Sequence, residues 1–365
     1  MVQLQLKEME KERISSMSYR DYVRRVVPYV PGEQPGDRKI IKLNTNENPY
    51  PPAPGVEKAL REMQPDRLRL YPDPCITELA EALARYHGVD PGQVFVGVGS
   101  DDVLAMSFLT FFHGDKPILF PDITYSFYDV WAELFGIPYK TCPLDEAFQI
   151  HPEDYRQDCG GVIFANPNAP TGLLLPLAAV EEILQEHPDV TVIVDEAYID
   201  FGGESCLPLL DKYENLLVVR TFSKSRSLAG MRIGYAIGNP EMIGYLNDVK
   251  FSFNSYTMNL PAIRLGVASV EDEDYFVRRK EQIIATRERS KEELRKLGFT
   301  FPDSATNFLF VKHPEKPAEY LFEQLKKQGI YVRYFKKPRI QEYLRISIGT
   351  DQEMDALFEA LRKLV

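Results

Sequence analysis

The sequence has 365 residues, of which 44% are hydrophobic, and a formal net charge of -11 at pH 7. This length predicts about two domains, and the apolar content is sufficient for buried cores. The negative charge is spread along the chain, which disfavours a nucleic-acid backbone or an anionic membrane as the main partner. Any anion that the protein binds must therefore be met by local positive charge.

The four cysteines are widely spaced and include no CxxC pair. This spacing predicts neither a metal site nor a disulfide framework. The opening MVQLQLKEMEKERISS mixes charged and apolar residues, and no apolar run approaches the roughly 20 residues that span a bilayer. We therefore expect a soluble, cytoplasmic protein.

The first 45 or so residues form a polar segment that we predict to be a helical arm, ending at the proline-rich turn of residues 28–32. A second proline cluster, residues 51–54, precedes the helix-like GVEKALREM. The amphipathic stretch ITELAEALARYHG follows and ends at Gly88, which suits a helix C-cap.

The middle of the chain alternates short apolar runs with helical stretches, the pattern of a largely parallel sheet covered on both faces. The predicted strands are residues 117–120, 161–165, 191–195, 216–221 and 234–238. In open sheets of this kind, ligands bind beyond the carboxyl ends of the strands. The residues that follow each run are therefore the first candidates for a site.

From about residue 275 the sequence changes to the α+β alternation of a second, smaller domain. A charged helix (VRRKEQIIATRERSKEELRKLG) precedes the probable strands NFLFV, YVRYF and YLRISIG and a closing helix. We predict an arm at residues 1–45, a large domain at 46–270 and a small domain at 271–365.

Four predicted strands deliver chemically useful side chains to one edge of the sheet. Tyr125 follows the first strand, Asn168 the second, Asp195 and Tyr198 the third, and Lys224 the fourth. A lysine directly after a buried strand can lose part of its hydration, which favours the neutral amine that forms a Schiff base. A lysine on a turn is nevertheless usually a solvated surface residue.

The other side chains at this edge also allow two interpretations each. Asp195 could cap a helix, or it could pair with a pyridinium nitrogen and keep that nitrogen protonated. Tyr125 and Tyr198 could be core residues or contacts of a cofactor ring. Each residue alone is a weak indication.

A phosphate cradle is indicated by Gly97-Val98-Gly99-Ser100-Asp101-Asp102, which leads into an apolar helix. Glycine allows close backbone approach, and the free N–H groups of a helix N-terminus bind anions. Ser100 or Asp101 could instead serve only as an N-cap. Arg232 can supply the positive charge that a phosphate needs. An amine, phosphate donors, a pyridinium carboxylate and a stacking aromatic together indicate a phosphate-bearing aldehyde, pyridoxal 5'-phosphate.

The run from Thr221 to Gly234 (TFSKSRSLAGMRIG), with Asn168-Ala169-Pro170-Thr171-Gly172 and Asp195-Glu196-Ala197-Tyr198, closely resembles fold-type I aminotransferases. Within that group, VRRVVPYVPGEQPGDRKIIKLNTNENPYPP, YPDP and YLRISIGT resemble the histidinol-phosphate aminotransferases, from about residue 23 to the end. The resemblance implies a seven-stranded, mostly parallel large domain and a small α+β domain built from both chain ends. It also implies a homodimer with active sites at the interface.

The resemblance also implies roles for individual residues. Lys224 would form the Schiff base with the cofactor, Asp195 would bind the pyridine nitrogen, and Tyr198 would bind the 3'-oxygen. Tyr125 would stack on the ring. The implied phosphate contacts are the backbone amides of Ser100 and Asp101, the residues Thr221, Ser223 and Arg232, and Tyr71 from the other subunit. The implied substrate contacts are Arg345 for the glutamate carboxylate, Arg333 and Tyr29 for histidinol phosphate, and Asn307 with Asn46 or Asn48 lining the pocket.

One position departs from the family pattern. The family usually has asparagine directly before Pro-Thr-Gly, where it donates to the 3'-oxygen of the cofactor, and this chain has Ala169. Alanine has no side-chain donor, so either Tyr198 makes that hydrogen bond alone or Asn168 or a water molecule substitutes.

The implied reaction is transamination between histidinol phosphate and 2-oxoglutarate, a step of histidine biosynthesis. An aromatic aminotransferase or a threonine-phosphate decarboxylase shares the same cofactor motifs and stays open at this point. A non-catalytic sensor that binds the cofactor is disfavoured, because no basic helix-turn-helix segment precedes residue 23.

Overall fold

The computed structural model describes residues 18–30, 32–34 and 40–365. Two compact units are present, Met1–Val30 and Pro31–Val365. In the first unit the described backbone forms one short 3-10 helix, η1 (Tyr19–Tyr22), where the Ser18 hydroxyl accepts from the Arg20 amide. Residues 23–30 form no helix, so the predicted helical arm is wrong there, and residues 1–17 lie outside the described residues.

The second unit contains a seven-stranded sheet with the strand order β2-β8-β7-β6-β5-β3-β4. Strand β8 is antiparallel to β2 and β7, and the remaining neighbours pair in parallel. This sheet confirms the mostly parallel seven-stranded α/β architecture. The strands are β2 (Val94–Gly97), β3 (Ile118–Pro121), β4 (Tyr139–Cys142), β5 (Gly161–Ala165), β6 (Val192–Asp195), β7 (Leu216–Thr221) and β8 (Gly234–Gly238).

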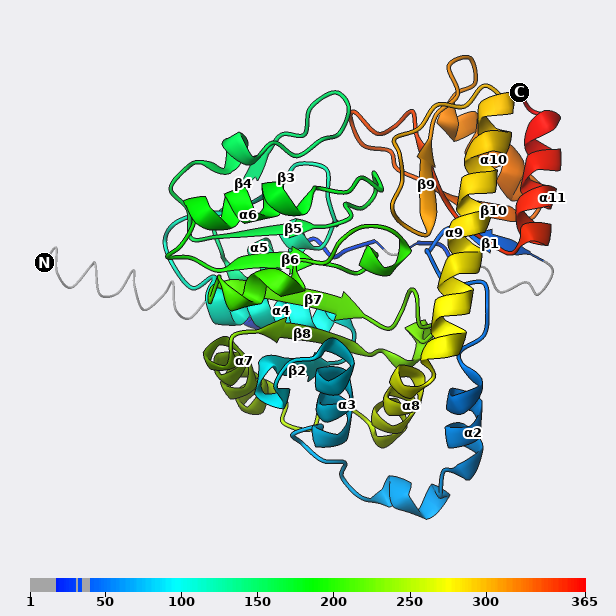
Figure 1. The fold of residues 1–365 in the computed structure, drawn as a ribbon. Coiled ribbons are helices and arrows are strands. Elements are labelled where there is room, and N and C mark those ends of the chain that lie inside the picture. Colours follow the sequence, from blue (N-terminus) through cyan, green and yellow to red (C-terminus); the bar gives the residue numbers. More distant parts are fainter. Residues whose placement is uncertain (1–17, 31, 35–39) are drawn as a thin grey trace, which may run out of the picture. The chain divides into compact units, whose positions relative to one another are not determined.

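Apolar side chains of the buried strands point alternately to the two faces of this sheet, which explains why helices cover both faces. Val162 and Phe164 pack with the residues of α6, whereas Ile163 between them packs with α4 and α5 on the other side. Figure 1 shows α6 and α4 on opposite sides of the strands. The helices of this region are α2 (Pro54–Glu62), α3 (Thr77–His87), α4 (Ser100–Phe111), α5 (Tyr128–Phe135), α6 (Leu177–Glu186), α7 (Pro240–Phe253) and α8 (Leu260–Glu271). Gly88 ends α3 in the left-handed conformation, as the sequence predicts.

A second sheet of four strands has the order β1-β10-β11-β9. Its strands are β1 (Ile41–Leu43), β9 (Phe308–Val311), β10 (Ile330–Tyr334) and β11 (Leu344–Ser347). Because β1 pairs in parallel with β10, both ends of the unit contribute to one sheet. Three helices pack beside it in Figure 1, namely α9 (Glu273–Lys296), α10 (Ala318–Lys327) and α11 (Asp351–Arg362). This sheet confirms the smaller α+β part; the boundaries at residues 45 and 270 stay predictions.

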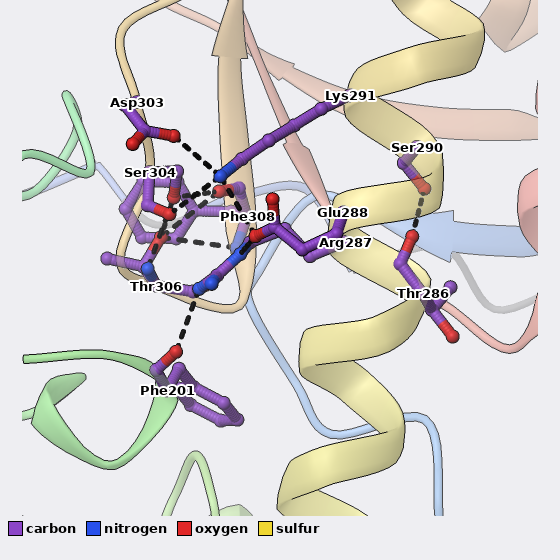
Figure 2. A network of polar contacts seen from close by, with 10 residues as sticks. All are labelled: Phe201, Thr286, Arg287, Glu288, Ser290, Lys291, Asp303, Ser304, Thr306 and Phe308. Carbon is purple, nitrogen blue, oxygen red and sulfur yellow. Dashed lines mark hydrogen bonds and ion pairs between the residues drawn. The ribbon is translucent and has the colours of Figure 1, made fainter.

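Two buried basic residues of α9 hold the loop that precedes β9 (Figure 2). Arg287 donates to the backbone oxygens of Phe201 and Thr306, both at 2.9 Å. Lys291 donates to the carboxylate of Asp303 at 2.7 Å and to the Ser304 carbonyl at 3.3 Å. The long helix is thereby tied both to the segment after β6 and to the segment that carries Asn307.

Candidate active site

The carboxyl ends of β3, β5, β6 and β7 meet at one edge of the large sheet, because these strands are mutually parallel. Lys224 lies three residues beyond β7 and is half-buried. Its Nζ lies 5.5 Å from the ring centroid of Tyr198 and donates to the Thr45 carbonyl at 3.4 Å. The predicted amine and phenol are therefore neighbours, although they are 26 positions apart in the sequence.

Asp195 is the last residue of β6 and is 4% exposed. Its carboxylate accepts from the Ala197 amide at 3.1 Å and from the Tyr128 hydroxyl at 3.2 Å. Burial raises the pKa of the Asp195 carboxyl to about 7, and the nearby charge of Asp101 adds to that shift. No α-helix begins at this residue, so the helix-cap alternative does not apply. A buried carboxylate of this kind is stabilised by a cationic partner such as a pyridinium N–H.

Two predicted pocket residues contact one another beside Tyr198. The Asn46 side chain donates to the Tyr198 hydroxyl at 2.9 Å, and the Asn307 side chain donates to the Asn46 carbonyl at 3.0 Å. Asn48 instead donates to the carbonyl oxygen of Lys224 at 3.2 Å. The structure thus brings both asparagines of the NENP segment to the site, on different partners.

The predicted phosphate cradle is built around the first turn of α4. Gly99 precedes the helix, and neither Ser100 nor Asp101 caps it with its side chain. A Cβ at Gly234 would lie 2.3 Å from the Ser100 nitrogen, and a Cβ at Gly99 would lie 2.4 Å from Arg232 Nη2. These glycines allow the arginine and the free helix N–H groups to approach each other, the arrangement that an anion needs.

The side chains around the cradle form a connected set. Arg232 lies within hydrogen-bonding distance of the Asp101 carboxylate at 3.2 Å and of the Ser223 hydroxyl at 3.3 Å. The Tyr125 hydroxyl donates to the same carboxylate at 2.7 Å. The Thr221 hydroxyl accepts from the Ser223 amide at 3.1 Å, which shapes the turn before Lys224. These five residues therefore converge from four segments: the start of α4, the ends of β3 and β7, and the turn before β8.

Asn168, named as a substitute for the missing amide donor, is buried, and its Nδ2 donates to the Ile123 carbonyl and the Thr171 hydroxyl, both at 3.0 Å. Its two amide protons are thus directed to protein acceptors. Ala169 is 5% exposed and belongs to the same apolar cluster as Tyr198. The side chain that stands in the position of the family asparagine thus offers packing only.

The two predicted substrate arginines lie on neighbouring strands of the small sheet. Arg333 in β10 is the register partner of Arg345 in β11. The Cζ atoms of Arg333 and Arg345 lie 5.3 Å and 5.5 Å from the ring centroid of Phe335. Arg345 also donates to the Asn44 carbonyl at 3.0 Å. Two guanidinium groups opposite each other on neighbouring strands could together bind one anion, as the sequence predicts for the substrate site.

Two further predicted contacts are Tyr71 and Tyr29. The side chain of Tyr71 is 82% exposed and packs on Tyr256, with 4.6 Å between ring centroids. Tyr29 belongs to the first compact unit, where it is half-buried. The roles of both residues stay predictions.

The sequence did not indicate Tyr128 or Thr45, which contact Asp195 and Lys224. A buried tyrosine in the first turn of a helix looks like a core residue, and Thr45 acts through its backbone oxygen. The proximity of Tyr128 to the predicted ring-stacking residue Tyr125 was the one available signal. Both contacts depend on tertiary structure.

A family model described as Aminotransferase class I and II matches residues 38–361. The chain belongs to the class I and II aminotransferases. The histidinol-phosphate aminotransferase of Lactococcus lactis subsp. cremoris (strain MG1363) is 52% identical over 347 residues, which cover 95% of this chain and 98% of that protein. Histidinol-phosphate aminotransferase 1 of Hydrogenovibrio crunogenus is 53% identical over 350 residues, covering 96% of this chain and 98% of the relative.

Solved structures agree with the fold of this aminotransferase. The histidinol-phosphate aminotransferase of Sinorhizobium meliloti in complex with pyridoxal-5'-phosphate is 28% identical, with a TM-score of 0.80 over 90% of this chain and 93% of that one. The Clostridium acetobutylicum enzyme is 25% identical, with a TM-score of 0.82 over 88% of this chain and 98% of that one. The predicted aminotransferase activity and the cofactor, pyridoxal 5'-phosphate, are confirmed. The buried Asp195 carboxylate and the glycine-lined cradle with Arg232 fit the two ends of that molecule.

Proposed function

We propose that this aminotransferase transfers the amino group of histidinol phosphate to 2-oxoglutarate, giving imidazole acetol phosphate and glutamate in histidine biosynthesis. The main observation behind the proposal is that Arg333 in β10 and Arg345 in β11 are directly paired across the two strands. In one half-reaction the pocket must bind the phosphate of histidinol phosphate, and in the other it must bind the carboxylates of glutamate. A planar guanidinium accepts either anion with paired hydrogen bonds. The names of the similar curated proteins support the same substrate.

The cofactor would be held at its pyridine nitrogen, its phosphate, its ring face and its 3'-oxygen. Asp195 would pair with the pyridine nitrogen, and that pairing stabilises the carboxylate whose pKa burial raises. The α4 amides at Ser100 and Asp101 with Arg232, Thr221 and Ser223 would bind the phosphate. Tyr125 would stack on the ring, Tyr198 would bind the 3'-oxygen, and Asn168 would support the turn beside them through Ile123 and Thr171.

When bound, the cofactor supplies an aldehyde that links to an amine and a protonated ring that accepts an electron pair. Lys224 acts as the general base that takes the proton from the substrate Cα. The Thr45 carbonyl accepts from its Nζ and so restrains the amine on the side of Tyr198. Asn307 and Asn46 would line the substrate pocket, where the Asn307 side chain donates to the Asn46 carbonyl.

The active enzyme would be a cytoplasmic homodimer in which each site receives Tyr71 from the other subunit. The exposed ring of Tyr71, packed on Tyr256, suits that role, because a residue that serves a neighbouring site must lie at the surface of its own chain. Tyr29 would complete the histidinol phosphate site. Among the described residues, no helix has the length and apolar content that crossing a bilayer requires.

A half-reaction screen tests the substrate. Purified enzyme is mixed in turn with histidinol phosphate, phenylalanine, tyrosine and threonine phosphate, and loss of the absorbance of the bound cofactor is followed. The fastest loss is expected with histidinol phosphate. Fastest loss with phenylalanine or tyrosine would make the enzyme an aromatic aminotransferase, and release of carbon dioxide from threonine phosphate would make it a decarboxylase.

A further inference from the structure

A chain of buried hydrogen bonds connects the small sheet to the Tyr198 hydroxyl. Asn46 is 1% exposed and Ser347, in β11, is 2% exposed. The Asn46 backbone N–H donates to Ser347 Oγ at 2.8 Å, and the Ser347 hydroxyl donates to Asn46 Oδ1 at 3.0 Å. Asn46 Nδ2 then donates to the Tyr198 hydroxyl at 2.9 Å.

The serine determines which way the Asn46 amide faces. With the observed orientation, the Ser347 proton has Asn46 Oδ1 as its acceptor. Reversal of the amide would place an NH2 group against that hydroxyl, and among the described residues the serine proton would then have no acceptor. The NH2 group therefore points toward Tyr198.

The backbone at Asn46 is adapted to this contact. Its φ of 55° lies in the left-handed region, which asparagine tolerates better than most residues. Asn307 also donates to the Asn46 carbonyl at 3.0 Å and fixes the peptide from its other side. The amide is thus held by partners from two segments that are remote from it in the sequence.

The direction of the hydrogen bond determines what Tyr198 does with its own proton. Because the hydroxyl oxygen accepts from Asn46, its O–H is left to donate elsewhere, and no protein acceptor for it exists within the described ranges. Phe308 packs edge-on against the Tyr198 ring at 5.1 Å and limits its movement. The hydroxyl is accordingly a donor with a fixed position.

We propose that Asn46 and Ser347 are positioning residues that direct the Tyr198 proton onto the 3'-oxygen of the cofactor, where Ala169 offers no amide donor. This inference rests on the proposed placement of Tyr198 at that oxygen. Asn46 is thus assigned to the cofactor through Tyr198, in addition to lining the pocket.

The relay starts on β11, the strand that also carries Arg345. Ser347 lies two residues after Arg345, so both side chains are attached to β11 on the same face of the small sheet. A shift of β11 toward a bound anion would also move Ser347 and, through Asn46, the phenol.

The test is a pH titration of the absorbance of the bound cofactor, which requires no substrate. A donated hydrogen bond stabilises the anionic 3'-oxygen in the basic form, so weaker donation raises the titration midpoint. Asn46→Gly, which retains the left-handed backbone, and Ser347→Ala are each expected to raise it by about half to one pH unit. Ser290→Ala removes another buried hydroxyl, on α9, and serves as the matched control with no shift expected.

The decisive measurement repeats both substitutions in a Tyr198→Phe background, where neither should move the midpoint further. Shifts that persist without the phenol would overturn the relay, as would unchanged midpoints in both single variants when Tyr198→Phe alone raises the midpoint. If Asn46→Gly fails to fold, Ser347→Ala decides by the same criteria. If Tyr198→Phe itself moves nothing, the placement of Tyr198 fails and the relay fails with it, whereas the substrate screen can fail without affecting this result.

Discussion

Arg333 and Arg345 lie directly opposite each other across the β10–β11 ladder, with the Phe335 ring within 5.5 Å of both guanidinium carbons. Like charges at directly opposed positions repel, and an anion bound between the two guanidinium groups, as proposed, would reduce that repulsion. Histidinol phosphate and glutamate both supply such an anion. The two arginines need not contribute equally to both substrates.

Arg333→Ala is expected to weaken histidinol phosphate much more than glutamate, because the dianionic phosphate uses the second guanidinium. Arg345→Ala is expected to impair both substrates. Loss of a charged hydrogen-bonding partner costs about 2 to 5 kcal/mol, or roughly 30-fold or more in kcat/KM. Steady-state kinetics of each variant with each substrate measure the loss of kcat/KM. Lys336→Ala, at an exposed lysine, is the control. Equal small losses for Arg333→Ala on both substrates would refute the phosphate-site assignment.

Lys224→Ala is expected to purify without a covalent link to the cofactor. Borohydride reduction followed by peptide mapping should label the peptide containing Lys224 in the wild-type protein and nothing in the variant. Lys212→Ala, which removes a surface lysine, should behave as wild type. A labelled peptide elsewhere in the wild-type protein would make the assignment of the Schiff-base lysine wrong.

Asp195 makes the stability of the cofactor-free protein depend on pH. Burial raises its pKa to about 7, above the value of an unfolded aspartate, so the folded chain binds the extra proton between about pH 4 and 7. The contribution is fully present below pH 4 and is lost as the pH rises through 7, with a slope of up to about 1.4 kcal/mol per pH unit. Denaturant unfolding of wild type and Asp195→Asn across this range should show the loss only in wild type. Added cofactor should abolish the difference in slope, and parallel curves without cofactor would contradict the prediction.

Tyr71 is expected to act in the site of the other subunit. Tyr71→Phe and Lys224→Ala proteins are each expected to have little activity, whereas a mixed dimer contains one site with both residues intact. Mixing the two variants under conditions of subunit exchange should therefore give each mixed dimer up to half the activity of a wild-type dimer. Exchange is verified independently with differently tagged subunits, and no regained activity after proven exchange would rule out a shared site.

Arg287 is predicted to stabilise the folded protein by holding the loop before β9 through its two backbone hydrogen bonds. Arg287→Leu would leave the carbonyls of Phe201 and Thr306 without a donor, at a cost of about 2 to 5 kcal/mol in the free energy of unfolding. Denaturant midpoints measure the loss. Arg278→Leu on the exposed side of the same helix is the matched control and should change stability by less than about 0.5 kcal/mol. Equal effects of the two substitutions would show that the buried network is not responsible.

Much of the large sheet follows from local sequence. The predicted bounds of β5, β7 and β8 coincide with the observed ones, because short runs of buried β-branched residues have few alternative structures. Strand β4 was not predicted, since three of its four residues are exposed and it reads as a polar loop. Strand β2 is only four residues long, and its last residue, Gly97, already belongs to the glycine-containing segment of the cradle.

The sequence by itself determined that a lysine, a carboxylate and a phenol stand at the ends of parallel strands, because strand direction alone brings those ends together. Which groups those side chains contact was decided by tertiary structure. Asn46 and Ser347 are 301 positions apart, and no periodicity relates them. The pairing of Arg333 with Arg345 depends on the register of two strands, since a slip of one residue would turn one arginine to the other face of the sheet.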